Sequence, residues 1–348
     1  MEKSTHGELV ALAMAVAGAA AALAIGLLTF GVQATAAPSH VPLAVGATDP
    51  ALAPIAGRVA ARGGDAVSWR TVGSRAEAER LLDDREIYGA VLFSPGAGGP
   101  TATVLVSGAI NPSATQVAEP VLTQVAAAVL TSARTQPAGA SPALRVVTIH
   151  PTSAAGRALP LAASALLWLG ALITAVLVAV AAPRLRGGRP LGRLATLAAA
   201  VVSALLGTAV VAGLARAWDS SLTLDWNAAG FLALVGLAFA LLQAAVLRWL
   251  GVRGMALLIP LYLTAPAVAG LVPELLNPVY RDALWSWTPF RFSTEGLRSL
   301  LFLGTEGPDV RTALWVFGAI AAAGLLAVLA PGPTRAPRAA GAPQAISR

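Results

Sequence analysis

The densest group of side chains that could do acid–base chemistry is a mixed-charge stretch at residues 75–86. It places five carboxylates within ten residues, beside three guanidinium groups: Glu77, Glu79, Asp83, Asp84, Glu86, Arg75, Arg80 and Arg85. Acids and bases three or four positions apart pair along one face of a helix and stay hydrated. We therefore interpret this stretch as a solvated helix surface and not as a catalytic centre.

The chain has few residues of the types that bind metals or act as nucleophiles. It has no cysteine, which excludes disulfides, thiolate metal sites and a cysteine nucleophile. Its three histidines are far apart in sequence, and we interpret His40 and His150 as incidental rather than as a metal pair. Motifs for serine hydrolases, zinc proteases and ATP-binding P-loops are missing. We expect no enzymatic activity, no metal and no cofactor in this chain.

Composition indicates a membrane protein instead. Hydrophobic residues make up 56% and charged residues 12% of the 348 residues, against about 25% charged residues in ordinary soluble domains. The net charge of +7 is a property of some nucleic-acid-binding proteins, but here the arginines are sorted between loops. We interpret that distribution as a signal for membrane topology and expect no nucleic-acid partner.

Six apolar stretches have the length of a membrane-spanning helix, about 20 residues for a hydrocarbon core of about 30 Å. They are residues 9–31, 158–182, 194–215, 228–247, 254–272 and 312–330. None contains Asp, Glu, Lys, Arg or His, so ion-coupled transport has no candidate intramembrane relay. Pro260 and Pro266 interrupt the fifth stretch, and we expect them to kink that helix.

Arginines without acidic neighbours mark the loops expected in the cytoplasm. The clearest is the loop at 183–193, which holds Arg184, Arg186, Arg189 and Arg193. This pattern predicts a multi-pass protein of the cell membrane with both termini cytoplasmic. Residues 1–8 would form the cytoplasmic N-terminus, residues 32–157 would be extracytoplasmic, and residues 331–348 would form a disordered cytoplasmic tail.

The first span has a second interpretation. Ala34-Thr35-Ala36 resembles a signal-peptidase site, so that residues 1–36 would be removed. We favour a retained anchor because the apolar run is longer than in typical signal peptides. The residues before it, MEKSTHGE, also lack the positive charge of a signal peptide.

The sequence pattern of residues 32–157 predicts an inserted domain in which strands and helices alternate. The expected strands are 41–47, 65–72, 87–93, 102–107 and 144–150, and the expected helices are 49–64, 75–85 and 113–133. Asp49 precedes the first helix as its N-cap, and Ser74 with Glu77 forms a capping box before the second. The fold class is therefore an α-helical integral membrane protein with six transmembrane helices, the remaining five within residues 158–330, and an α/β extracytoplasmic domain with a mixed sheet.

Two segments outside the spans could carry function. The first is the basic loop at 183–193, in which Pro190 can start a short helix at the membrane surface. Its four arginines have two interpretations. They either fix the membrane topology or form a cytoplasmic docking surface for a separate ATPase.

The second segment, residues 273–308, is too polar to span and rich in aromatic residues. Ser293 or Thr294 would cap a short amphipathic helix in the outer membrane interface. This segment is either an interfacial collar or an outward gate. Its candidate residues are Trp285, Trp287, Pro289, Glu295 and Arg298.

Three stretches resemble a known family: VPLAVGATDPALAPIAGRVA, SRAEAERLLDDREIYGAVLFSP and LLNPVYRDALWSWTPFRFSTEGLRSLLFLG. They are similar to the six-helix, type-2 permeases of ABC exporters, in the branch with a large extracytoplasmic domain that includes phage-infection-protein-like proteins. The last stretch, with Trp287, Pro289, Glu295, Gly296 and Arg298, carries most of the resemblance.

The resemblance implies export of a hydrophobic or amphipathic compound, driven by an ATP-binding cassette subunit that is encoded separately and binds the ATP. It implies that two permease units pair in the bilayer, as a homodimer or a heterodimer, and that the 183–193 loop corresponds to the coupling helix. An alternative from another class is a membrane scaffold or receptor that does not transport. Its outer domain would bind a partner in the cell envelope.

Overall fold

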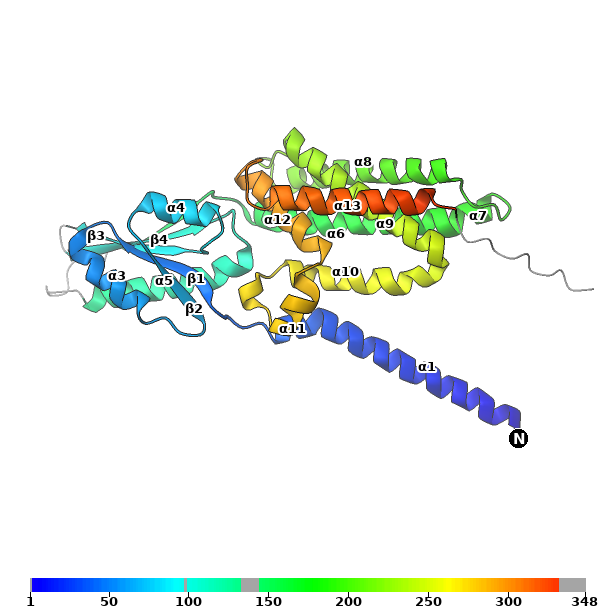
Figure 1. Ribbon diagram of the computed structural model, residues 1–348, viewed down its shortest axis with the longest axis horizontal. Helices are drawn as coiled ribbons and strands as arrows, with labels where there is room; N and C mark the ends of the chain where they lie inside the picture. The colour runs from blue at the N-terminus through cyan, green and yellow to red at the C-terminus, as the bar shows by residue number, and fades with distance from the viewer. Residues whose placement is uncertain (1, 97–98, 133–143, 332–348) are drawn as a thin grey trace, which may run out of the picture.

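The computed structural model describes residues 2–96, 99–132 and 144–331, and Figure 1 shows an elongated molecule. A small α/β domain forms one end, and long helices form the other. The predicted disordered tail lies outside the described residues, apart from residue 331. The side chains at 2–7, 9–10 and 265–266 also lie outside the description.

Within the described residues, five strands form one mixed sheet, as predicted. They are β1 (Val41–Ala47), β2 (Val67–Val72), β3 (Ala90–Gly96), β4 (Gly99–Ser107) and β5 (Leu144–Ile149). Their order across the sheet is β2-β1-β3-β4-β5. The pair β3–β4 is antiparallel, whereas the pairs β1–β2, β1–β3 and β4–β5 are parallel.

Three helices pack against this sheet: α3 (Ala53–Ala60), α4 (Arg75–Asp83) and α5 (Pro112–Ser132). Asp49 accepts a hydrogen bond from the Ala51 amide, which starts a 3₁₀ turn, η2 (Pro50–Leu52), ahead of α3. The predicted helix 49–64 ends early, at Ala60, because Gly63 and Gly64 follow and glycine disfavours helix.

The predicted capping box of α4 is confirmed. Ser74 Oγ accepts from the Glu77 amide, and the Glu77 carboxylate accepts from the Gly73 amide. The sheet and its helices enclose a separate apolar core. Its largest fully buried side chains include Leu43, Phe93, Leu105, Leu81, Leu82 and Leu122.

The other end of the molecule holds the long apolar helices. They are α1 (Glu2–Gly26), α6 (Ala154–Val176), α8 (Arg193–Trp218), α9 (Trp226–Leu250), α10 (Met255–Ala269) and α13 (Val310–Leu329). In the described part of the chain, five stretches are long and apolar enough to cross a membrane. Their length and composition agree with a membrane protein.

The fourth and fifth predicted spans form one of these five stretches, Trp226–Ala269. It consists of α9 and α10, joined by a 3₁₀ turn, η4 (Gly251–Gly254). Pro260 and Pro266 both fall inside α10, which has 15 residues. At 1.5 Å per residue α10 is about 22 Å long, shorter than a hydrocarbon core of about 30 Å.

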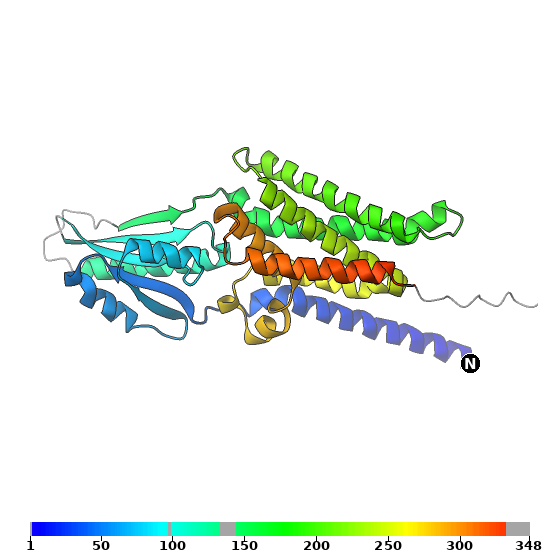
Figure 2. The same cartoon turned by 45° about the horizontal axis from the view of Figure 1, so that its top comes forward.

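Helix α9 is the centre of the bundle and contacts α6, α8 and α13 (Figure 2). Trp168 and Phe239 meet edge to face, with ring centroids 4.9 Å apart, and Phe290 and Phe317 complete the cluster. On α13, Gly324 allows close approach, because an added Cβ would lie 2.8 Å from Leu241 Cβ and 2.9 Å from the Leu242 amide nitrogen.

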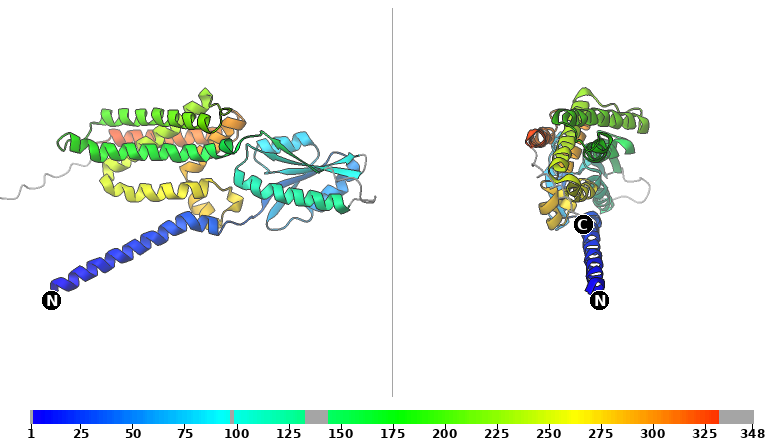
Figure 3. Two further views of the ribbon diagram at one scale, coloured as in Figure 1. Left: turned by 180° about the vertical axis from the view of Figure 1, so that it is seen from behind. Right: turned by 90° about the vertical axis from the view of Figure 1, so that its right-hand side faces the viewer.

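Helix α1 lies apart from the bundle along most of its length (Figure 3), and its apolar stretch is unburied. It continues into η1 (Leu27–Gly31), a π-helical turn, and α2 (Val32–Ala34). Contact with the bundle is made there: Val32 is fully buried beside Val268 and Leu276, and Tyr280 Oη donates to the Leu27 carbonyl at 2.9 Å.

Helix α12 (Pro289–Phe302) lies across the domain end of the bundle and contacts α6, α9, α10 and α13 (Figure 1). The prediction that Ser293 or Thr294 caps this helix is wrong. Its N-cap is Thr288, and both hydroxyl residues lie buried inside it, where Ser293 accepts a 2.7 Å hydrogen bond from Ser164 of α6. Many of its side chains are buried, and its expected position in the outer membrane interface stays a prediction.

Candidate functional site

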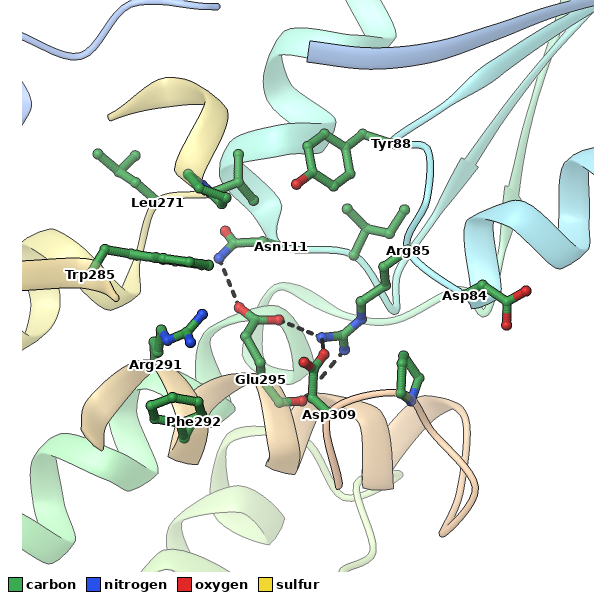
Figure 4. Close-up of a pocket in the computed structure, with 14 residues that line it drawn as sticks. Asp84, Arg85, Tyr88, Asn111, Leu271, Trp285, Arg291, Phe292, Glu295 and Asp309 are labelled. Carbon is green, nitrogen blue, oxygen red and sulfur yellow. Dashed lines mark hydrogen bonds and ion pairs between the residues drawn. The ribbon is translucent and has the colours of Figure 1, made fainter. Parts of the chain in front are cut away.

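The candidate site lies where the α/β domain meets the bundle. Four segments distant in sequence contribute to it: the turn after α4, the turn before α5, helix α12 and the turn before α13. They bring together Arg85, Asn111, Glu295 and Asp309, as Figure 4 shows.

Arg85 is the side chain that joins the two parts. Its backbone has a positive φ of 59°, which ends α4 and turns the side chain towards the bundle. Its Nη1 donates to Glu295 Oε2 at 2.7 Å and to Asp309 Oδ2. Its Nη2 donates to the Ala109 carbonyl at 3.2 Å. The Arg85 side chain is 12% exposed, so the prediction that it belongs to a solvated surface is wrong.

The rest of the predicted charged surface is as expected. Arg75 pairs with Glu79 and Arg80 pairs with Asp84, both four positions apart and exposed. Arg85 differs because it lies two residues beyond the end of the helix, directly after the C-cap Asp84, where the backbone leaves the helical path.

Glu295 is the acceptor at the centre of the network. It also pairs with Arg298, which is buried, and its Oε1 accepts from Asn111 Nδ2 at 3.1 Å. Burial favours the neutral carboxyl, but Arg298 and Arg85 outweigh it and hold the pKa of Glu295 below its usual value. Glu295 is therefore an ionised carboxylate, and both of its oxygens accept hydrogen bonds.

Asp309 behaves in the opposite way. Burial raises the pKa of its carboxyl, and the nearby charge of Glu295 raises it further, although Arg85 opposes the shift. The two carboxylates share the guanidinium of Arg85, but Glu295 also has Arg298 and Asn111 as partners. Their different environments therefore shift their pKa values in opposite directions.

A pocket of about 190 Å³ opens beside this network (Figure 4). Its lining combines the polar side chains of Arg85, Asn111, Glu295, Asp309 and Arg291 with apolar side chains that include Leu271, Val272, Trp285 and Phe292. Mixed linings of this kind suit compounds that have a polar and an apolar part.

Tyr88 closes the pocket on the side of the α/β domain. Its hydroxyl donates to Glu274 Oε2 at 2.7 Å, which links the domain to the segment after α10. Burial, reinforced by Glu274, raises the pKa of this phenol far above its usual value. Tyr88 is therefore a neutral, fully engaged donor.

Only some of the predicted gating residues line the pocket. Trp285 and Glu295 line the pocket, and Arg298 supports Glu295 from behind. Pro289 is buried at the start of α12. Trp287 is 54% exposed and donates to the Ala283 carbonyl, away from the pocket lining.

Sequence reasoning did not identify Asn111, Arg291 and Asp309 as site residues. No local pattern marks them, since Arg85 is 210 positions from Glu295 and 224 from Asp309. The one available signal was Arg85 itself, a lone arginine beyond the last turn of a helix whose other arginines have partners four positions away.

The predicted docking loop lies at the far end of the bundle (Figure 1). Helix α6 runs through a π-helical turn, η3 (Leu177–Ala181), into α7 (Ala182–Leu185). The four arginines there, Arg184, Arg186, Arg189 and Arg193, are exposed. Pro190 does not start a helix, because Gly187 and Gly188 form a turn with positive φ and α8 begins only at Arg193.

A groove of about 450 Å³ opens next to this loop. The end of α6, the loop and the end of α9 form it, with Pro183, Pro190, Thr196, Arg248 and Trp249 among its lining residues. Arg248 Nε is buried there without a hydrogen-bond partner among the described residues.

The described residues contain no group of three or more His, Asp or Glu side chains arranged to hold a metal ion. His150 Nε2 lies 3.0 Å from Asp83 Oδ1, and His40 Nδ1 lies 3.1 Å from Ser39 Oγ. Each histidine therefore has a single local partner of its own.

No protein-family model, no curated protein and no solved structure matches the chain. Its function must therefore be inferred from the site and from the helices that carry it.

Proposed function

We propose that this chain is the membrane-spanning permease subunit of an ABC-type exporter, with six transmembrane helices and an extracytoplasmic α/β domain. It moves a hydrophobic or amphipathic compound outward, and a separate ATPase subunit drives the movement. The observation that carries the proposal is the pocket of about 190 Å³ with mixed lining, at the end of the bundle where the outer domain is attached.

The distribution of charge supports this assignment. The ionisable residues of α6, α8, α9 and α13 lie near their ends, for example Arg157, Arg216, Arg248 and Arg311. The chain therefore presents polar groups to a cargo at the outer junction, but it has no proton relay across the bilayer. Energy for uphill movement must come from outside this polypeptide.

Helix α10 and the residues that follow it up to Val272 supply the fifth crossing in this proposal. Helix α10 alone is shorter than the bilayer core, and α12, which contacts it, lies at its outer end and outside the crossing. Broken helices of this kind occur in membrane proteins where they line a cavity. Leu271 and Val272 follow α10, and Phe292 and Glu295 belong to α12; all four line the pocket.

The opposite end of the bundle suits the ATPase. Its exposed arginines at 184–193 have no acidic neighbours in sequence, and the groove beside them includes the exposed Trp249 and Val252. A basic, partly apolar surface fits an acidic protein partner. In the proposed orientation this end and both termini lie in the cytoplasm and residues 32–157 lie outside, as the distribution of arginines predicts.

Co-purification tests the docking surface. The chain is expressed with a P-loop ATPase encoded beside its gene, and we expect the two to co-purify. Changing Arg184, Arg186, Arg189 and Arg193 together to Glu should abolish the association. A matched control changes four exposed arginines of the α/β domain, Arg58, Arg62, Arg75 and Arg145, to Glu and should retain it. Equal retention by both variants would overturn the docking assignment.

Transport is tested in inside-out vesicles with a fluorescent amphipathic compound. We expect uptake that requires ATP and both subunits. Uphill flux driven by a proton gradient, with purified chain alone and no nucleotide, would contradict the proposal. A chain that binds an envelope partner through its outer domain but supports no flux would instead be a scaffold or receptor.

A further inference from the structure

Among the described residues, Arg291 is the charged residue of the pocket lining that has no ion pair. Arg85 pairs with Glu295 and Asp309, and Arg298 pairs with Glu295. Asp84 pairs with Arg80 outside the pocket. The carboxylates of Glu295 and Asp309 act on Arg291 from beyond ion-pair distance, and its Nε is buried without a hydrogen-bond partner.

Aromatic rings fix the orientation of this guanidinium. Its Cζ lies 3.9 Å from the ring centre of Trp285 and 4.1 Å from that of Phe292. One of its terminal nitrogens, Nη2, donates to the Ser286 carbonyl at 3.3 Å. With the two rings against it and Nη2 engaged, the guanidinium is held in one orientation at the wall of the pocket, without an ion pair of its own among the described residues.

We propose that Arg291 binds the head group of a monoanionic amphiphile, with the first carbons of the apolar chain against Trp285 and Leu271. A carboxylate or a phosphodiester supplies the planar or forked oxygens that a guanidinium edge prefers. The inference rests on the proposed function, because it narrows the exported compound from amphipathic to acidic.

Two further observations agree with an anion at Arg291. Burial lowers the pKa of Arg291, so an anion that neutralises it relieves a cost of folding. The pocket, at about 190 Å³, is smaller than the roughly 300–1,000 Å³ of sites that enclose whole small molecules. It therefore fits a head group rather than a complete lipid.

The test uses the full chain in nanodiscs of neutral lipid, without ATPase or nucleotide. A photoreactive fatty acid is crosslinked to the protein, and mass spectrometry locates the label. We expect label on pocket residues such as Leu271, displaced by decanoate at least tenfold more effectively than by decanol. Dihexanoyl phosphatidylglycerol is the second competitor, and the stronger of the two anions identifies a fatty acid or a phospholipid as the source. Equal displacement by decanoate and decanol would overturn the proposal.

Variants assign the effect to one side chain. Arg291→Gln should lose the preference for decanoate over decanol, whereas Arg291→Lys, which keeps the charge, should retain it at reduced affinity. Arg281→Gln is the matched control, because Arg281 is exposed and pairs only with its neighbour Asp282 among the described residues. An unchanged preference in Arg291→Gln would overturn the assignment.

The binding result and the transport result are separable. Head-group preference without ATP-dependent flux would remove the exporter proposal and leave the site. Flux of neutral and acidic compounds alike would remove the site and leave the exporter.

Discussion

Arg85 holds the α/β domain against the bundle through two carboxylates and a carbonyl. Removing it would leave Glu295 buried with one cation fewer and Asp309 with no ion pair in the described structure. Loss of one partner from a buried pair is costly because the remaining charge stays desolvated.

We therefore predict that Arg85→Ala lowers the free energy of unfolding by about 3 kcal/mol. Arg80→Ala is the control on the same helix. Its pair with Asp84 is exposed, with side chains 57% and 50% accessible, and such pairs contribute about 0–1 kcal/mol. Denaturant unfolding in detergent measures both, and equal effects would show that the Arg85 contacts are no stronger than surface pairs.

The same network predicts opposite pH effects for its two acids. The pKa of Glu295 is lowered from 4.5 in the folded protein, so its contribution to stability is complete above that value and is lost as the pH falls through the folded pKa. The pKa of Asp309 is raised from 3.8, so its contribution is present below 3.8 and is lost as the pH rises through the folded pKa.

Glu295→Gln should therefore reduce the loss of thermal stability on acidification below 4.5, whereas Asp309→Asn should make that loss steeper. Melting temperatures across an acidic pH series measure both effects. Two variants that change the profile in the same direction would contradict this account of the pair.

At the scale of elements, α13 and α9 pack closely because of Gly324. An added Cβ at that position meets Leu241 and the backbone of Leu242, and backbone atoms cannot move aside. We predict that Gly324→Ala destabilises the protein by about 1–3 kcal/mol. Gly318→Ala, on the same helix with nothing within 4 Å, should be neutral or stabilise by up to about 1 kcal/mol. Thermal unfolding in detergent compares them.

The elements that depend on local signals could be predicted from the sequence. Asp49, Ser74 and Glu77 fix helix starts through bonds to amides two to four residues away, and alternation of side chains fixes the strands. Helix α12 could not be placed, because its hydroxyl residues resemble caps and only the packing against Ser164 shows that they are buried. The pocket was equally hidden, since its charged partners come from three separate regions of the chain.

For the whole molecule, orientation in the membrane is the prediction with the widest consequences. The chain has no cysteine, so single cysteines can be introduced into an unreactive background. Ala51 is exposed in the α/β domain, and Leu185 is 88% exposed at the end of α7. A membrane-impermeant maleimide should label Ala51→Cys on intact cells and Leu185→Cys only after the membrane is opened. The reverse pattern would invert the proposed topology.

The separation of α1 from the bundle has a consequence for the maturation of the protein. Proteolytic removal of residues 1–36 would leave the aromatic cluster around Trp168 and the sheet intact. The loss would include the Tyr280–Leu27 hydrogen bond, the contacts of η1 and α2 with α10, and the burial of Val32; burial of one such side chain contributes about 1.5–3 kcal/mol. A processed chain would then keep its site, and its new amino terminus would lie on the side of the α/β domain. The processed and the intact chain would differ in mass but not in the site.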